Sequence, residues 1–349
     1  MKLFIYSVLA FLLFTGLVPA EEKSVSIVID QRGAPEHGAF TQDGKKFVTG
    51  GEDGTVRVWD TQGNELLKWQ GAHRGNYYAS FSPDGKKIVL TQRGVVGENT
   101  LQMIDAETGK SLKKLEPTGR ITSVAFSPDG KKIVTTEQDS LLVPMGLPIR
   151  IWDAETGMEL PRQRLIGHTR GAHFAAFLPD GERILSVSHD YTIRLWSTDS
   201  GKELRRFQVM DNPPDDVRTT LWSVDFSSDG RKIAAAIHGN IRIWDADTGT
   251  ELKRFATHDT YYYLSLSFSP DGKKVMTVGH GDSRIRIWDA ESGWELQRLD
   301  PPDRVSNKAI FSPDGKMVVT GPMVYRVRIW DLDRVPVLPP PIVPAIRDF

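Results

Sequence analysis

The sequence contains no cysteine among its 349 residues. This absence excludes disulfide bonds, a thiolate metal site, a cysteine nucleophile and a cysteine-linked lipid anchor. Exported domains without disulfides rely on a large core, and 39% of this chain is hydrophobic, which is enough for one. The chain also lacks an excess of one charge. Its formal net charge of -1 gives no general attraction to nucleic acid or to an anionic membrane.

The common catalytic signatures are absent as well. There is no Gly-x-Ser-x-Gly elbow, no P-loop, and no dinucleotide fingerprint between a strand and a helix. The eight histidines show no metal-ligand spacing such as His-Glu-x-x-His. We therefore predict no catalytic residue, no cofactor and no metal.

One long apolar run is present, at the N-terminus. Lys2 precedes an apolar stretch at residues 3–17, and Val18-Pro19-Ala20 forms a small-residue exit. We interpret residues 1–20 as a secretory signal peptide cleaved near Ala20, with an uncleaved membrane anchor as the alternative. No later segment approaches membrane-spanning length. We expect an exported protein that is periplasmic, secreted or held at the cell surface.

An Asp-Gly turn recurs along the rest of the chain, and Trp-Asp or a related pair follows each copy. The turns begin at Asp43, Asp84, Asp129, Asp180, Asp229, Asp271 and Asp314. Before such a turn, apolar residues alternate as in a strand, for example Val124 and Phe126. Ile149, Ile151 and Trp152 make a later strand apolar on both faces. Radial stacking of similar sheets covers both faces of each sheet.

These units resemble the WD-repeat family of β-propellers, and the text of the repeats resembles its bacterial, exported members. The family signatures are the Trp-Asp dipeptide, a Gly-His before the first strand and a spacing of about 40–45 residues. The resemblance implies an all-β, seven-bladed β-propeller of four-stranded antiparallel blades over residues 21–333.

The two ends of the repeat region predict how the ring closes. Residues 24–30 alternate like a strand but follow no unit, and the last unit stops after its third strand. We expect residues 24–30 to complete the last blade, which removes two sheet edges. Residues 334–349 contain five prolines and are expected to form a proline-rich tail, either lying on the propeller or loose, or else a docking peptide.

The resemblance also implies a structural hydrogen-bond network within a blade. Blade four matches it best, with His168, Ser188, Asp190 and Trp196. His168 and Asp190 look like a catalytic pair, but their positions in the repeat favour a structural role.

The repeats differ most at three insertions, at residues 92–99, 137–148 and 209–220. The resemblance implies that these connections emerge on one face, and that the regular turns emerge on the other. Function concentrates on irregular loops held by a rigid scaffold, so we predict that the loop-rich face binds the partner. Its candidate residues are Tyr77, His173, Trp222, Tyr262, Asp139, Leu142, Asp215 and Asp216. The aromatic ones suit interface anchors, with packing between blades as the alternative.

Members of the family mostly act as interaction platforms, so we predict a noncatalytic scaffold for a protein or peptide. One alternative is a propeller enzyme with a metal-assisted site at the channel mouth, for which Glu36, His37 and His173 are the candidates. Another is a carbohydrate or cell-wall binding module that stacks sugars on Tyr77, Trp222 and Tyr262. Paired lysines at the turns alternate with acidic residues, so no nucleic-acid partner is expected. The sequence gives no indication of oligomeric state.

Overall fold

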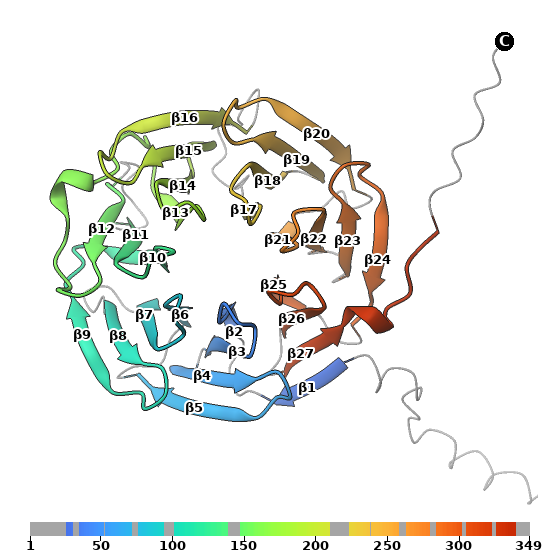
Figure 1. Cartoon of the computed structure of the whole chain (residues 1–349), viewed down its shortest axis with the longest axis horizontal. Helices are drawn as coiled ribbons and strands as arrows, with labels where there is room; N and C mark the ends of the chain where they lie inside the picture. The colour runs from blue at the N-terminus through green and yellow to red at the C-terminus, as the bar shows by residue number, and fades with distance from the viewer. Residues whose placement is uncertain are drawn as a thin grey trace, which may run out of the picture.

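The computed structural model is a ring of seven antiparallel sheets around a central opening (Figure 1). The structure describes residues 26–30, 35–51, 53–71, 76–93, 101–138, 147–209, 223–237, 239–257, 263–279, 284–301, 305–322 and 326–339. The predicted seven-bladed, all-β fold is confirmed. The predicted signal peptide and the end of the tail lie outside the described residues.

Most blades have four strands, ordered from the central opening outward. Blade one contains β2 (Pro35–Phe40), β3 (Lys46–Gly51), β4 (Thr55–Asp60) and β5 (Glu65–Gln70). Blade two contains β6 (Asn76–Phe81), β7 (Lys87–Arg93), β8 (Leu101–Asp105) and β9 (Ser111–Leu115). Blade four contains β13 (Ala172–Phe177), β14 (Arg183–Ser188), β15 (Thr192–Ser197) and β16 (Glu203–Gln208). Blade five contains β17 (Ser223–Phe226), β18 (Lys232–Ile237), β19 (Asn240–Asp245) and β20 (Glu251–Ala256). Blade six contains β21 (Tyr263–Phe268), β22 (Lys274–Gly279), β23 (Ile285–Asp289) and β24 (Glu295–Leu299).

Blade three departs from the expected four strands. It contains β10 (Arg120–Phe126), β11 (Lys132–Gln138) and β12 (Arg150–Asp153). A short 3-10 helix, η1 (Pro161–Gln163), replaces the outer strand, and two isolated bridges, Ile149 to Leu165 and Trp152 to Glu159, remain. Proline has no backbone N–H to donate to a strand ladder, so Pro161 interrupts this edge.

Blade seven contains strands from both ends of the chain. β25 (Val305–Phe311), β26 (Met317–Pro322) and β27 (Arg326–Asp331) are joined by β1 (Ser26–Asp30). β1 pairs antiparallel with β27, with Ser26 opposite Trp330 and Asp30 opposite Arg326 (Figure 1). This pairing agrees with the expected closure of the ring.

The hydrophobic core lies between neighbouring blades. One cluster joins Val187 and Leu195 of blade four to Ile233 and Trp244 of blade five. Burying such side chains stabilises the fold by roughly 1.5–3 kcal/mol each. Each blade therefore depends on its neighbours for its buried surface.

The turns between the first and second strands are nearly identical. In six blades a serine or threonine hydroxyl donates to the turn aspartate, for example Ser127 Oγ to Asp129 Oδ1 at 2.6 Å. Blade four has Leu178 instead, and its Asp180 accepts from Arg183 Nε at 2.6 Å.

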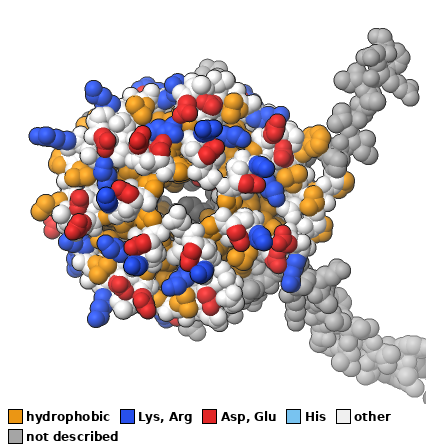
Figure 2. Space-filling model, in the orientation of Figure 1, with side chains coloured by type: hydrophobic (Ala, Val, Ile, Leu, Met, Phe, Trp, Pro, Cys, Tyr) orange, Lys and Arg blue, Asp and Glu red, His pale blue; other side chains and the backbone are white. Residues whose placement is uncertain are grey.

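The face seen in Figure 2 carries basic and acidic side chains interspersed around the central opening, without an area of one sign.

The first residues of the predicted tail pack on blade six. η2 (Leu332–Arg334) follows β27, and Leu332 and Val335 are buried in a core cluster. Gln297 Nε2 donates to the carbonyls of Leu332 and Val335, at 3.1 and 3.0 Å. Leu338 N donates to Leu296 O at 2.7 Å. The predicted boundary at residue 334 therefore falls within a segment that lies on the propeller. Within the part of the chain that the structure describes, no helix has the length and apolarity to cross a membrane.

Candidate functional site

The predicted partner-binding residues fall largely outside the described part of the chain. This applies to Asp139, Leu142, Asp215, Asp216, Trp222 and Tyr262. Tyr77 lies in β6, and Glu36 and His37 lie in β2, but the side chains of all three are outside the description. These predictions remain untested by the structure.

His173 is the described member of that set. It lies in β13, and its ring packs against that of His189, with 4.8 Å between ring centroids. His189 directly follows β14, beside the network of blade four. Among the described residues, no group of three or more His, Asp or Glu side chains is arranged to hold a metal ion.

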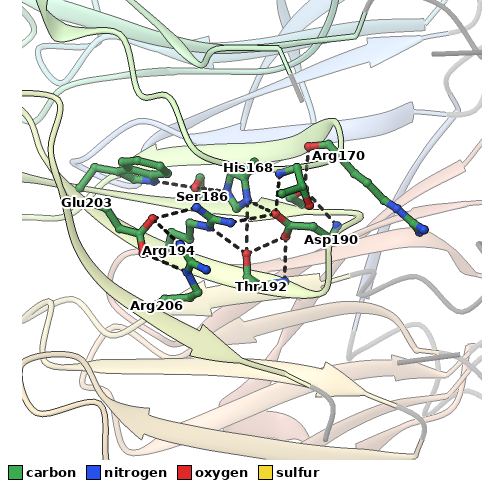
Figure 3. Close-up of polar contacts among 11 residues, drawn as sticks. His168, Arg170, Ser186, Asp190, Thr192, Arg194, Glu203 and Arg206 are labelled. Atoms are coloured by element: carbon green, nitrogen blue, oxygen red, sulfur yellow. Dashed lines mark hydrogen bonds and ion pairs between the residues drawn. The ribbon is translucent and has the colours of Figure 1, made fainter. Parts of the chain in front are cut away.

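The network of blade four is built around His168, which is 8% exposed (Figure 3). His168 Nδ1 lies 2.9 Å from Asp190 Oδ2, and Nε2 lies 2.7 Å from Ser186 Oγ. Trp196 Nε1 donates to the same Oγ at 2.7 Å. An ionised carboxylate only accepts, so His168 Nδ1 donates to Asp190, and Nε2 hydrogen-bonds with the Ser186 hydroxyl. Both ring nitrogens are therefore occupied.

The predicted role of Ser188 in this network is wrong, because Ser186 fills it. Ser188 Oγ donates to Arg170 O at 2.9 Å and accepts from Asp190 N at 3.1 Å. Alternate residues of a strand share a face, and Ser186 is the one level with the indole N–H of Trp196. The same hydroxyl position recurs in other blades, where Trp59 donates to Thr49, Trp152 to Thr135 and Trp288 to Thr277. The threonines at this position of the other repeats could have identified Ser186 from the sequence.

Asp190 connects the network to the loop entering β13 and to the next strand. It accepts from Thr169 N at 3.0 Å, from Thr192 Oγ1 at 2.6 Å and from Arg194 Nη2 at 3.1 Å. Burial alone would raise the pKa of Asp190, but the hydrogen bonds from His168, Thr192 and Thr169 hold it well below its usual range. The carboxylate thus stays ionised and fixes the backbone of the loop.

In blade three, Glu137 anchors the corresponding loop, and the sequence reasoning missed it. Glu137 was assigned to the insertion at 137–148, but it lies in β11 and is 2% exposed. Its Oε2 accepts from Thr118 N and Gly119 N at 3.2 and 2.9 Å, and Oε1 accepts from Arg150 Nη1 at 3.1 Å. Arg150 could have indicated Glu137 from the sequence, since a buried guanidinium needs a carboxylate partner.

An arginine two residues before the tryptophan pairs with an acidic residue toward the outer edge of its own blade. Arg57 binds Glu65, Arg194 binds Glu203 and Arg242 binds Glu251. In blade three, Arg150 binds Glu159, and Arg164 also bonds this carboxylate. The bond from Arg164 outweighs the cost of burial and, with Arg150, lowers the pKa of Glu159 to about 2. These ion pairs belong to the blades themselves.

Comparison with known proteins agrees with this architecture. The family described as "WD domain, G-beta repeat" matches residues 37–60, 109–142, 160–197, 214–245 and 249–289. The chain is 28% identical over 163 residues to a serine-threonine kinase receptor-associated protein of Gallus gallus, covering 47% of this chain and 42% of the relative. It is 28% identical over 188 residues to the target of rapamycin complex subunit LST8 of Mus musculus, covering 52% and 56%. It is 25% identical over 170 residues to the cell division cycle 20.6 protein of Arabidopsis thaliana, described as a cofactor of APC complex, covering 45% and 37%.

The repeat matches between residues 37 and 289 and the seven-bladed ring support the resemblance to the WD40-repeat family. The matched region spans 42% of the chicken relative and 56% of the mouse relative, and all three relatives are eukaryotic.

Proposed function

We propose that this protein is a noncatalytic WD-repeat scaffold that binds a protein or peptide through its loop-rich face. The observation that carries the proposal is the contrast between the two kinds of connection in the ring. The turns after the inner strands repeat one hydrogen bond in six blades. The connections at the other ends of these strands differ in length and sequence, with insertions at residues 92–99, 137–148 and 209–220. A scaffold gains specificity where its parts differ.

The relatives support a role in assembly. The mouse relative is a complex subunit by its name, and the plant relative is described as a cofactor of a complex. A rigid ring with varied loops suits such a role, because it presents them in fixed positions.

We propose further that the protein is an exported, bacterial type of propeller. The support is the charge, apolar run and small-residue exit of residues 1–20. Mass spectrometry of the protein recovered from an expressing bacterium should give a chain beginning at residue 21, outside the cytoplasm. An intact N-terminus in the cytoplasmic fraction would refute export.

The binding face is tested by replacing residues 139–146 and 210–222 with glycine-serine linkers of equal length. A matched control replaces Lys131 and Lys273 with glutamine, since these exposed lysines belong to the regular turns. In affinity capture from the cell envelope, the loop variant should lose proteins that the control retains. Equal capture by both variants contradicts the assignment of the face.

A further inference from the structure

Two loops that enter the ring are fixed in the same way, and an arginine follows each. In blade three, Glu137 accepts from Gly119 N, and Arg120 comes next. In blade four, Asp190 accepts from Thr169 N, and Arg170 comes next. The buried carboxylates thus fix the backbone from which the two arginine side chains extend.

These two arginines differ from those inside the blades. Arg57, Arg194 and Arg242 each bind a carboxylate. Within the described part of the chain, no carboxylate pairs with Arg120 or Arg170. Arg120 Nε and Arg170 Nη1 are buried without a hydrogen-bond partner, as are Arg57 Nη1 and Arg150 Nε, but Arg57 and Arg150 have a carboxylate elsewhere on the guanidinium. Figure 3 shows the guanidinium of Arg170 extending away from the network of blade four. A partly buried guanidinium without a counter-charge is costly, so an anion bound beside it recovers free energy.

A histidine pair lies beside Arg170. The rings of His173 and His189 are 4.8 Å apart, and His189 Nδ1 is also buried without a hydrogen-bond partner among the described residues. His189 N donates to Gly171 O at 3.1 Å, which holds it next to the loop carrying Arg170. Burial lowers the pKa of His189, and the charge of Arg170 lowers it further. The Asp190 carboxylate acts in the opposite direction on this pKa.

The two blades bring these groups together at the same ends of their inner strands. Thr122 Oγ1, two residues after Arg120, donates to Ala172 O, two residues after Arg170, at 3.1 Å. β10 and β13 thus lie side by side, with both arginines at their entry ends. His173 follows Ala172 directly, so the imidazole pair belongs to the same corner of the ring.

We propose that Arg120, Arg170 and His189 form a binding site for the carboxylates of an acidic peptide segment. Arginine donates in a planar fork that matches a carboxylate, and His189 offers one further nitrogen. Two guanidinium groups fit one or two acidic side chains rather than the long charged backbone of a nucleic acid. The inference rests on the proposed function, since it names the partner chemistry of the loop-rich face.

The test uses the whole protein and a fluorescent, capped peptide of six glutamates, with the glutamine peptide as its uncharged match. Fluorescence anisotropy at low salt should show binding of the glutamate peptide only. The double variant R120Q/R170Q should weaken it by about tenfold or more. The double variant K131Q/K273Q, which removes the same charge from the regular turns, should leave it unchanged. NMR signals of the His173 and His189 rings should shift on titration with the glutamate peptide.

The variants are first shown to melt as the parent protein does, and R120K/R170K, which keeps the charges, then serves as the conservative pair. Absent binding by the parent, or equal binding by R120Q/R170Q, overturns the proposal. Tighter binding of a single-stranded oligothymidylate through the same arginines overturns it as well. Loss of partner capture in the loop variant but not in R120Q/R170Q would leave the scaffold function standing and refute the acidic partner.

Discussion

The carboxylate of Asp190 shows how one residue can connect several parts of a blade. It bonds a histidine of the entering loop, a threonine of β15 and the buried guanidinium of Arg194. Each of these groups would lose a partner if the carboxylate were removed. His168 and Asp190 resemble a catalytic pair, but here their hydrogen bonds hold blade four together.

Asp190→Ala should therefore be strongly destabilising. Removing one partner of a buried ion pair costs about 3–5 kcal/mol, because the remaining charge stays buried without compensation. Urea denaturation followed by circular dichroism measures this change. Asp199→Ala is the control, since its side chain is 91% exposed. Equal midpoints for the two variants would contradict the structural role of the network.

The pKa of Glu159 predicts a dependence of stability on acid. Its folded value of about 2 lies below the ordinary value of 4.5, so its contribution is complete above about pH 4.5 and is lost as the pH falls toward 2. The loss amounts to at most about 3 kcal/mol. Denaturation midpoints between pH 2.5 and 7 should fall less steeply for Glu159→Gln than for the parent protein. Glu155→Gln, on the exposed turn of the same blade, should follow the parent curve.

At the scale of elements, the sequence predicts the strands and turns that recur in every repeat. The strands, the turns and the closing strand at residues 24–30 all follow from a period shared by the copies. Blade three shows where this reasoning ends, because Pro161 interrupts its outer strand without altering the Asp-Gly or Trp-Asp signals. Glu137 was missed because comparing the repeats identifies a residue only when the other repeats carry a similar residue at the same position.

The candidate site was harder to predict than the fold. No motif distinguishes Arg170, and the proposed role of Arg120 and Arg170 depends on their lack of a carboxylate partner among the described residues. Sequence patterns report which residues occur, but not which donors lack acceptors. Only the side-by-side placement of β10 and β13 relates the two arginines.

The β1 strand gives a prediction at this scale. A chain lacking residues 21–31 leaves the edge of β27 open and removes the pairing of Ile27 with Ile329. We expect a lower melting temperature and a broad transition, measured by calorimetry. Removing residues 340–349 instead is the control for loss of a terminus. A truncated β1 variant that melts as sharply as the full chain would contradict closure by this strand.

At the scale of the whole molecule, the core clusters cross the boundaries between blades, so the ring should unfold as one unit. Ile233→Ala, at the junction of blades four and five, should cost about 2–5 kcal/mol. Hydrogen exchange measured by mass spectrometry should then rise by a similar factor in blades one and six. Leu252→Ala, whose side chain is 49% exposed, should change little. Faster exchange confined to blades four and five would show that the blades open separately.

The pairing of β1 with β27 also sets an order of events. Ser26 meets Trp330, so this contact forms only after almost the entire chain has been made. Bringing together the ends of a loop of about 300 residues costs on the order of 5 kcal/mol of chain entropy. We expect the other six blades to assemble first and to hold the two ends near each other, so that the joining of the ends is the last step of folding. A new chain start placed between two other blades would move this late step elsewhere in the ring, and refolding rates of such circular permutants would reveal it.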